Sequence, residues 1–415
     1  MKHKELMMRL TALGMSTTML CFSPATTLAM DMERVVRKRA MPEVYDEDNA
    51  IAVTDENGFV IEDGELIGYE GTAEKVVIPD GVTSIGIDAF AWYSSLTEVV
   101  IPDTVTEIMS SAFYNCTSLT KIVIPDSVTF IGGNAFSKTK WLEDQRIKSP
   151  LVIANDILID GSTATGKVVI PDTVKKIAGS AFGNCSSLTE IVIPNSVTDI
   201  GDLAFNDCSN LTKVVIPESV TSIQTGAFWG CSSLTEIIIP KGVTSIANDV
   251  FRNCSSLTKI VIPDGVTKIA NYMLFNCSNL TEVVIPNSIT SIEHYAFSGC
   301  SSLTSIKIPE SVTSIHDLAF GSSDVTIHGY PNSYAQTYAT EHNIPFVELK
   351  KEETPKNPSS DVAEKEYYYN PVLWAVEKGV IWFKSKPISN GRILYAWSSS
   401  NIPFESNGKT RTKNN

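Results

Sequence analysis

Short segments of alternating apolar and polar residues recur along this chain at a fixed interval. In the copy LTKIVIP (residues 119–125), Ile122 and Ile124 lie on one side of an extended segment. Lys121 and Val123 lie on the other side. The proline at the end stops the strand, because it has no N–H to donate to a neighbouring strand. Each copy therefore predicts a short strand with one buried side, followed by a turn.

The repeat has a strict period of 23 residues. Every interval between successive Ile-Pro pairs is 23 residues except the one from Pro125 to Pro171, which is 46. One unit has therefore been replaced by another segment of equal length. A fixed period of this size predicts a solenoid, in which each unit buries its apolar side against its neighbours. The prolines are Pro79, Pro102, Pro125, Pro171, Pro194, Pro217, Pro240, Pro263, Pro286 and Pro309.

After each proline the pattern predicts a turn and a return across the coil. In the third copy, Val128 and Ile131 would point inward, and Ala135-Phe136 would fill the far side. The predicted fold class is a repeat solenoid, mostly β, with parallel strands on one face and short helical or 3-10 corners. It would offer a long flat wall and no pocket. At Met273-Leu274-Phe275 the Ala-Phe pair is displaced by one, which predicts different packing.

The remaining segments are divided by composition and pattern. ILIDGSTATGKVVIP, inside the replaced unit, aligns without gaps on ELIGYEGTAEKVVIP before the first coil, which predicts the same capping strands twice. A single helical turn is predicted at WLEDQR (141–146), and a helix is predicted at NSYAQTYATEH, with Tyr334, Ala335, Tyr338 and Ala339 on one face. The predicted parts are a signal peptide (1–29), a flexible leader (30–56), a cap hairpin with the first strand (57–79), repeats (80–330) with the replaced unit at 137–166, a C-terminal cap (331–349), a linker (350–366), a helix (367–380) and an unfolded tail (381–415).

The N-terminus has the pattern of an export signal. The basic start MKHKELMMR precedes a mildly apolar stretch and a small-residue site ending at Ala29. A short anchoring helix is the alternative, but the apolar stretch is shorter than the ~18 residues that a membrane span needs. No later segment is long and apolar enough to cross a bilayer. We therefore expect a secreted, extracellular or cell-surface chain with no transmembrane segment in its mature form.

Acidic residues outnumber basic ones, and the formal net charge is −14. Cleavage after Ala29 would remove a net charge of +2 and leave −16. Such an excess argues against a surface for nucleic acid or anionic membrane, and it suggests an exported, solubilised protein.

One outward column of the strands carries charges that alternate in sign. In-register strands would set each charge between two opposite charges, which fixes the register because a slipped pairing would bring like charges together. The column carries no net sign that would attract a polyanion. This charge ladder comprises Lys75, Glu98, Lys121, Lys167, Glu190, Lys213, Glu236, Lys259 and Glu282.

Beside the charge ladder runs an outward apolar column, which we call the ribbon. Exposed apolar strips of this extent mark contact surfaces, but valine in this position also suits a strand, so both interpretations stay open. The candidate ligand face comprises the ribbon from Val100 to Val284 and the charge ladder from Lys121 to Glu282. The ribbon comprises Val77, Val100, Val123, Val169, Val192, Val215, Ile238, Val261 and Val284, and it is interrupted at Lys307.

Seven cysteines share one column of the repeat. Neighbouring coils would hold their Cβ atoms about 4.8 Å apart with parallel vectors, too far for a relaxed disulfide. The sequence has no CxxC pair or Cys/His cluster that would hold a metal. Small reduced thiols that pack the coil are therefore the favoured interpretation. The seven are Cys116, Cys185, Cys208, Cys231, Cys254, Cys277 and Cys300.

Candidates for catalysis are few. The five histidines share no repeat column, and the carboxylates recur at every coil, as on a solvated surface. No phosphate-binding or calcium-binding loop is present in the sequence. We expect no enzyme activity and no cofactor. Trp92, Tyr114 and Trp229 break the pattern near the Phe corner and are either local ligand contacts or partly covered corner residues.

The unit LxxIxIPxxVxxIxxxAFxxC, as at residues 96–116 and 188–208, closely resembles the BspA-like bacterial leucine-rich repeats. The resemblance covers about 270 residues. It implies a right-handed solenoid with short parallel strands on one face. It also implies a secreted or surface protein that binds host or matrix proteins or other cells. Two features depart from the family pattern: the replaced unit, and the last unit, which has Ser322-Ser323 where the cysteine is expected. Neither removes a known site.

The segment YYYNPVLWAVEKGV (367–380) resembles the first helix of an S-layer homology domain, which holds proteins on cell-wall polymers. Asn370, Pro371 and Gly379 suit the N-cap, N1 and C-terminal positions of a helix. Residues 394–415 can be back-translated so that the next reading frame resembles the missing half of such a domain. We therefore hypothesise a frameshift near Ile381, which the nucleotide sequence of the gene would test.

The sequence thus predicts a binding or adhesion scaffold for a protein or cell-surface ligand. The alternative is a structural or accessory subunit whose ribbon packs against a partner chain or a surface enzyme.

Overall fold

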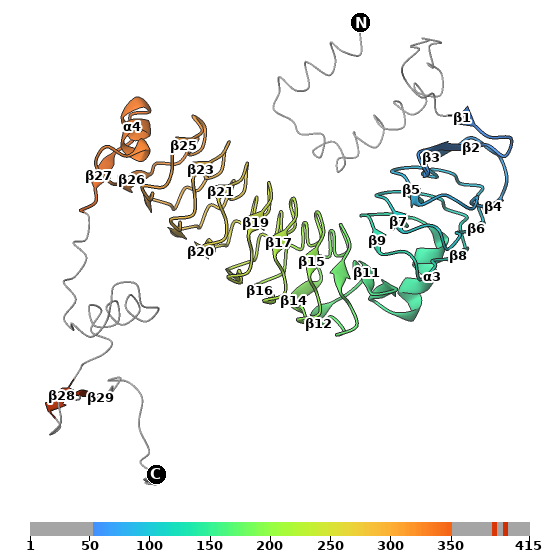
Figure 1. Ribbon diagram of the computed structural model, residues 1–415, viewed down its shortest axis with the longest axis horizontal. Helices are drawn as coiled ribbons and strands as arrows, with labels where there is room; N and C mark the ends of the chain where they lie inside the picture. Colours follow the sequence, from blue (N-terminus) through green and yellow to red (C-terminus); the bar gives the residue numbers. More distant parts are fainter. Residues whose placement is uncertain (1–52, 351–383, 388–392, 397–415) are drawn as a thin grey trace, which may run out of the picture.

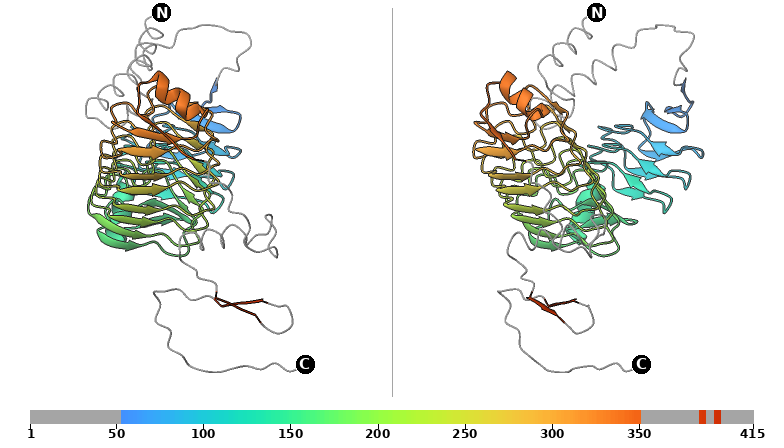
Figure 2. Two further views of the ribbon diagram at one scale, coloured as in Figure 1. Left: turned by 90° about the vertical axis from the view of Figure 1, so that its left-hand side faces the viewer. Right: turned by 60° about the vertical axis from the view of Figure 1, so that its left-hand side comes forward.

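The computed structural model describes residues 53–350 and two short strands, β28 (Lys384–Pro387) and β29 (Ile393–Ala396). Residues 53–350 form a parallel-strand β-solenoid of about 12 turns with few helices, which confirms the predicted fold class. Figure 1 shows two stacks of coils that meet at an angle at helix α3 (Lys140–Lys148), and Figure 2 shows both stacks diverging from it. We call them the first block (residues 53–136) and the second block (residues 152–349).

One ladder is built from the predicted strands. Parallel pairing joins residues 23 positions apart, such as Lys75 with Glu98 and Glu98 with Lys121. Because the Ile-Pro pair ends each strand, most of these strands are three residues long. They are β4 (Lys75–Val77), β6 (Glu98–Val100), β8 (Lys121–Val123), β12 (Gly166–Val169), β14 (Leu188–Val192), β16 (Lys213–Val215), β18 (Glu236–Ile238), β20 (Lys259–Val261), β22 (Glu282–Val284) and β24 (Ser305–Lys307).

A second parallel ladder, which the sequence analysis did not predict, runs along another side of the coils. Its strands have two residues, too few for an alternation that sequence could reveal, and the second residue is a buried isoleucine. Figure 1 shows this ladder on the inner side of the bend and the first ladder on the outer side. Its strands are β5 (Ser84–Ile85), β7 (Glu107–Ile108), β9 (Phe130–Ile131), β13 (Lys176–Ile177), β15 (Asp199–Ile200), β17 (Ser222–Ile223), β19 (Ser245–Ile246), β21 (Lys268–Ile269), β23 (Ser291–Ile292) and β25 (Ser314–Ile315).

The third side of each coil is a corner of consecutive turns, where the sequence predicted short helical or 3-10 corners. Successive backbone N–H groups donate alternately to the next coil and within their own turn. Phe90 N donates to Ala112 O of the next coil at 2.8 Å, whereas Ala91 N donates to Asp88 O of its own turn at 2.9 Å. This alternation excludes a continuous helix. The corner phenylalanines stack inside the coil, with ring centroids of neighbours 5.0 to 5.9 Å apart.

The cysteine column is buried and hydrogen-bonded. All seven are reduced thiols. Cys208 Sγ donates to Phe182 O of the preceding coil at 3.1 Å, and most other members repeat this bond. In the last coil Ser323 occupies the column and donates its hydroxyl to Phe297 O at 2.8 Å. The missing final cysteine therefore leaves the hydrogen bond in place.

The coil at residues 270–277 does not shift as predicted. Met273 and Leu274 are fully buried in the positions of alanine and phenylalanine, and Cys300 Sγ donates to Leu274 O at 3.1 Å. The Ala-Phe pair is therefore replaced rather than displaced, and Phe275 lies on the outer surface of the corner. Counting back three residues from Cys277 would have identified Leu274 as the buried member.

The replaced unit keeps the first buried positions of a regular coil and then departs. Thr139 occupies the cysteine column and Leu142 the following leucine column, and both are buried. Thr139 also caps α3, because its Oγ1 accepts a hydrogen bond from Leu142 N at 3.1 Å. The next residues, Glu-Asp-Gln-Arg, offer no apolar side for a strand, and the helix extends over nine residues where a single turn was predicted.

Helix α3 widens only one side of the solenoid. Trp141 N donates to Leu119 O at 2.7 Å, so the helix begins directly against the first block. At the corner, by contrast, a Cβ on Gly133 would lie only 3.0 Å from the backbone of Gly179. The blocks touch at the corner and are held apart at the first ladder, which accounts for the bend. The buried side chains accordingly divide into two clusters.

Hairpins precede both blocks in equivalent positions. β2 (Phe59–Glu62) and β3 (Glu65–Tyr69) pair antiparallel, as do β10 (Val152–Ala154) and β11 (Ile157–Asp160). β3 then pairs parallel with β5, and β11 with β13. β1 (Val53–Thr54) pairs with β2 at the first end.

The C-terminal end is closed by β26 (Thr326–Gly329), α4 (Tyr334–Glu341) and β27 (Phe346–Glu348). Ala335, Tyr338 and Ala339 of α4 are buried, whereas Tyr334, predicted on the same face, is 41% exposed. Tyr338 Oη donates to His316 O at 3.3 Å, which ties the helix to the last corner.

The signal peptide, most of the leader, the linker and the helix predicted at 367–380 lie outside the described residues. Within 381–415, predicted to be unfolded, β28 and β29 pair antiparallel. Asn390-Gly391, a dipeptide that favours turns, lies between them in the sequence.

Candidate ligand-binding face

The ribbon is exposed in both blocks on the outer side of the bend. Inside the second block its members are 39% to 50% exposed, because each is flanked by the equivalent side chain of the next coil. Val77, Val123 and Val169 reach 66%, 76% and 61%, because each stands at the end of a block. The structure therefore interrupts the ribbon between Val123 and Val169. The second-block members are Val169, Val192, Val215, Ile238, Val261 and Val284.

The charge ladder lies beside the ribbon with the predicted strand register. In the first block, Glu98 lies 3.2 Å from Lys75 Nζ and 3.8 Å from Lys121 Nζ, as predicted. In the second block the described side chains form separate pairs, because a lysine that turns toward one neighbour turns away from the other. The pairs are Lys167–Glu190 at 2.7 Å, Lys213–Glu236 at 3.7 Å and Lys259–Glu282 at 2.8 Å.

The two lysines change the titration of the glutamate between them. The hydrogen bond from Lys75, together with the charge of Lys121, holds the pKa of Glu98 below its usual value. Glu98 therefore stays ionised to a lower pH than an isolated glutamate would. The structural effect of the charge ladder is small, because exposed ion pairs contribute about 0 to 1 kcal/mol each.

The sequence predicted a flat wall without a pocket, and this prediction is wrong. An open cleft of about 700 Å³ interrupts the face at the end of the first block. Val100, Val123 and Lys121 line one side, and Trp141 and Gln145 of α3 line the other. The cleft exists because α3 replaces the strand that would have covered β8. Sequence reasoning missed it, although the replaced unit was a clear signal of its position.

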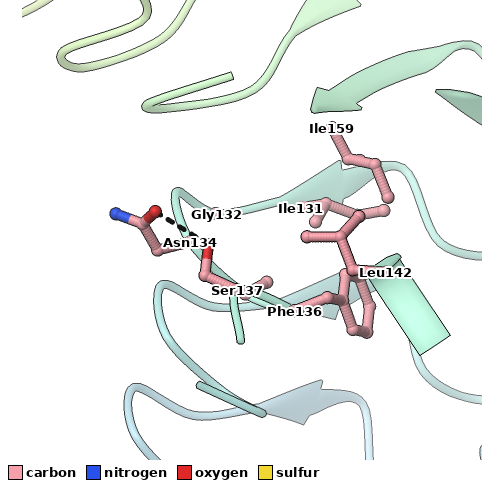
Figure 3. Close-up of a pocket in the computed structure, with 8 residues that line it drawn as sticks. Ile131, Gly132, Asn134, Phe136, Ser137, Leu142 and Ile159 are labelled. Carbon is pink, nitrogen blue, oxygen red and sulfur yellow. Dashed lines mark hydrogen bonds between the residues drawn. The ribbon is translucent and has the colours of Figure 1, made fainter. Parts of the chain in front are cut away.

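A second cavity, of about 10 Å³, lies inside the junction and has room for about one water molecule. Figure 3 shows Leu142 directed toward Ile131 and Phe136, and Ser137 Oγ bonded to Asn134 Oδ1 at 2.9 Å. The helix fills the end of the first core almost completely. This cavity is too small for a ligand.

The junction also contains a salt bridge. Arg146 Nη2 and Nε donate to the two carboxylate oxygens of Asp160 at 2.6 and 2.8 Å, and Asp160 is buried. A bidentate pair of this kind is directional. It fixes α3 to β11 and hence the helix to the second block.

The sequence singled out three corner aromatics, and the structure places them in two clusters. Lys138 Nζ lies 5.9 Å from the Trp92 ring and 4.9 Å from the Tyr114 ring. Trp229 lies farther along the chain beneath Arg252, whose guanidinium carbon is 5.0 Å from the ring centroid. Neither cluster belongs to the candidate ligand face.

Within residues 53–350, no group of three or more histidine, cysteine, aspartate or glutamate side chains could hold a metal ion. No helix among the described residues is long and apolar enough to cross a membrane.

The family model described as BspA type Leucine rich repeat region (6 copies) matches residues 69–162, 159–281 and 267–340. The chain belongs to the BspA-type leucine-rich-repeat family. This is a family of bacterial surface proteins. The BspA-type unit accounts for the buried columns of both blocks and for their 23-residue register.

Several solved structures are similar to this BspA-type chain. A leucine-rich repeat protein from Eubacterium ventriosum is 24% identical, with 62% of this chain and 88% of that chain covered and a TM-score of 0.41. A leucine-rich cell surface protein from Faecalibacterium prausnitzii is 29% identical, with 74% and 97% covered and a TM-score of 0.35. The pneumococcal vaccine antigen PcpA is 18% identical, with 69% and 71% covered and a TM-score of 0.38. No curated protein sequence matches the chain.

Proposed function

We propose that this protein is a secreted or cell-surface scaffold that binds a protein partner through its candidate ligand face and performs no catalysis. The observation that carries the proposal is the exposed ribbon, which runs without interruption across the six strands from β12 to β22. Contiguous apolar strips are uncommon on monomeric proteins unless they take part in binding. A scaffold that needed only strand propensity could use threonine, which is also β-branched and polar.

The charge ladder supports a partner that is recognised by contact rather than by net charge. Each lysine in the three second-block pairs already has a carboxylate partner within 4 Å, so the face has little net field. Capture by this face should therefore depend weakly on salt, in contrast to a face that attracts a polyanion.

The cleft supplies what the repeated columns lack. Equivalent coils present nearly the same side chains, so the ribbon alone gives a partner no preferred position along the solenoid. The cleft lies at the junction of the two blocks, and it sets Trp141 and Gln145 beside the exposed Val123. We infer that the ribbon provides apolar contact area and that the cleft fixes the position of the partner.

The test is capture of surface proteins by the full chain and by two matched variants. Val192, Val215, Ile238 and Val261 are changed together to threonine, which keeps the β-branched shape and removes the apolar surface. The control changes three exposed apolar residues outside the face to threonine: Ile87, Ile147 and Leu318. We expect the ribbon variant to lose at least tenfold in affinity for the captured protein and the control to retain it. Equal capture by both variants would show that another face binds.

The same preparations separate adhesion from assembly. A stable oligomer of the full chain in size-exclusion chromatography that dissociates in the ribbon variant would favour the accessory-subunit alternative. A monomer that still captures a partner would favour the proposed scaffold.

A further inference from the structure

The corners of the second block carry an aromatic cluster on a different side of the coil from the ligand face. Arg252 lies at its centre, with its guanidinium carbon 5.0 Å from the ring centroids of Trp229, Tyr272 and Phe275. Tyr295 continues the cluster and stacks on Tyr272 at 5.2 Å. We call these five residues the aromatic corner. They come from four successive coils, so the cluster forms a strip along the solenoid axis.

The backbone shows that the scaffold does not require these aromatic residues. Tyr272 and Tyr295 have φ values of 53° and 54°, in the left-handed region that bulky residues rarely adopt. In most other coils the same column holds small or polar residues suited to that conformation, and Leu203, with φ 57°, is a bulky exception. The small or polar residues are Asp88, Ser111, Asn134, Ser180, Gly226 and Asp249. Aromatic residues held in an unfavourable backbone conformation indicate a use at this place other than folding.

The charges in the aromatic corner cancel. Arg252 Nη1 donates to Asp249 Oδ1 at 2.9 Å, and both side chains are largely buried. His294 contacts Tyr295 with ring centroids 4.0 Å apart, and burial together with the neighbouring His316 lowers its pKa. At neutral pH the strip is therefore aromatic and uncharged. Such a surface offers nothing to an acidic or a basic polymer.

Side-chain amides line the strip at the spacing of the coils. Asn271 Nδ2 donates to Asn248 Oδ1 at 3.3 Å, and Asn276 Nδ2 donates to Asn253 Oδ1 at 3.3 Å. Each amide row has donors and acceptors to spare, because one bond per coil uses one of the two amide hydrogens. Ring faces flanked by amides match a sugar, whose C–H face packs on an aromatic ring while its hydroxyl groups bond at the edge.

We propose that the aromatic corner is a second binding site and that its ligand is a neutral glycan of hexopyranose units. The glycan lies along the strip, with sugar faces on the uncovered sides of Trp229 and Tyr295 and hydroxyl groups on the asparagine rows, while Tyr272 is held between Arg252 and Tyr295. This site is separate from the ligand face and acts independently of the proposed function.

The test is retardation of the full chain in native gels that contain a neutral polysaccharide: mannan, soluble starch or hydroxyethyl cellulose, with polygalacturonate as the charged comparison. The variant Tyr272→Asn with Tyr295→Asn introduces a residue type that suits the left-handed conformation, as Asn134 does in the same column. It should lower the affinity for the retarding polymer at least tenfold and leave the melting temperature unchanged or higher. Tyr334→Asn, an exposed tyrosine of α4, is the matched control and should change neither quantity.

Trp229→Ala tests the site without altering a left-handed position, and it should also lose at least tenfold in affinity. The proposal is overturned if no neutral polymer retards the wild-type chain, or if polygalacturonate alone does. It is also overturned if the double asparagine variant binds normally, or if its melting temperature falls well below that of the control. Loss of a protein partner by the same variants, without any glycan retardation, would assign the strip to protein contact instead.

Discussion

The first and second blocks are built from the same type of coil, but they differ in the cysteine column, whose side chains face the backbone carbonyls of the corner. In the first block that column holds Tyr93 and Cys116, and Thr139 holds the next position, just before α3. In the second block it holds six cysteines and then Ser323. Each solution places a hydrogen-bond donor there, since Tyr93 Oη and Thr139 Oγ1 also donate to backbone carbonyls. The fold therefore requires a donor of suitable size at this position rather than a thiol.

The largest predicted difference between the blocks appears at high pH. Burial raises the pKa of all six second-block thiols, and that of Cys300 to about 12. A raised pKa in the folded state means that stability is intact below the unfolded value of about 8.5 and is lost as pH rises above it. Each thiol contributes a slope of up to about 1.4 kcal/mol per pH unit between its unfolded and folded pKa, and the second block has six such thiols where the first block has one, Cys116. Hydrogen exchange between pH 9 and 11 should show the second block opening while the first stays protected.

The thiol count checks the same comparison directly. Thiol reagent at pH 8 should react slowly with the folded chain and should find about seven column thiols per mature chain in denaturant. Rapid reaction in the folded state, or a disulfide between neighbouring cysteines, would contradict the buried column.

A cavity in the phenylalanine stack should have the next largest effect. Phe205 lies between Phe182 and Phe228 and is fully buried, so Phe205→Ala should lower the free energy of unfolding by about 3 to 5 kcal/mol. Urea unfolding followed by hydrogen exchange should place the loss in the second block. If the first block lost equal protection, the two cores would be one cooperative unit.

The salt bridge at the junction should couple the blocks with an intermediate effect. Arg146→Met leaves the buried Asp160 carboxylate without its guanidinium, which should destabilise by about 2 to 3 kcal/mol, less than a fully buried pair because Arg146 is partly exposed. Small-angle scattering should also show a wider range of angles between the blocks. The double variant Arg146→Met with Asp160→Leu is the control and should recover most of the stability.

The smallest expected effect lies on the ligand face. The pKa of Glu98 is depressed, so its contribution is present above the unfolded value of about 4.3 and is lost as pH falls through the folded value. Glu98→Gln should remove a slight acid-side dependence of stability and leave capture unchanged. A large loss of capture would mean that the charge ladder, not the ribbon, carries recognition.

The regular coils could be read from the sequence because every apolar column repeats. The ribbon, the strand register and the buried thiols follow from positions such as Val123, Glu98 and Cys208. The second ladder was missed because a two-residue strand has no period. The cleft was missed because the route of the chain after Leu142 depends on how α3 packs against the first block. Trp229 alone indicated an unusual corner. The rest of the aromatic corner was missed because its residues belong to two different columns of the repeat, which come together only when the coils stack.

The most direct test of the ligand face is a photo-crosslinking side chain placed at Val215 of the full chain. The partner captured from a surface extract should crosslink at this position, in the middle of the ribbon. It should not crosslink from the same side chain placed at Ile87, which is equally apolar and lies outside the face. Crosslinking at Ile87 with none at Val215 would contradict the account.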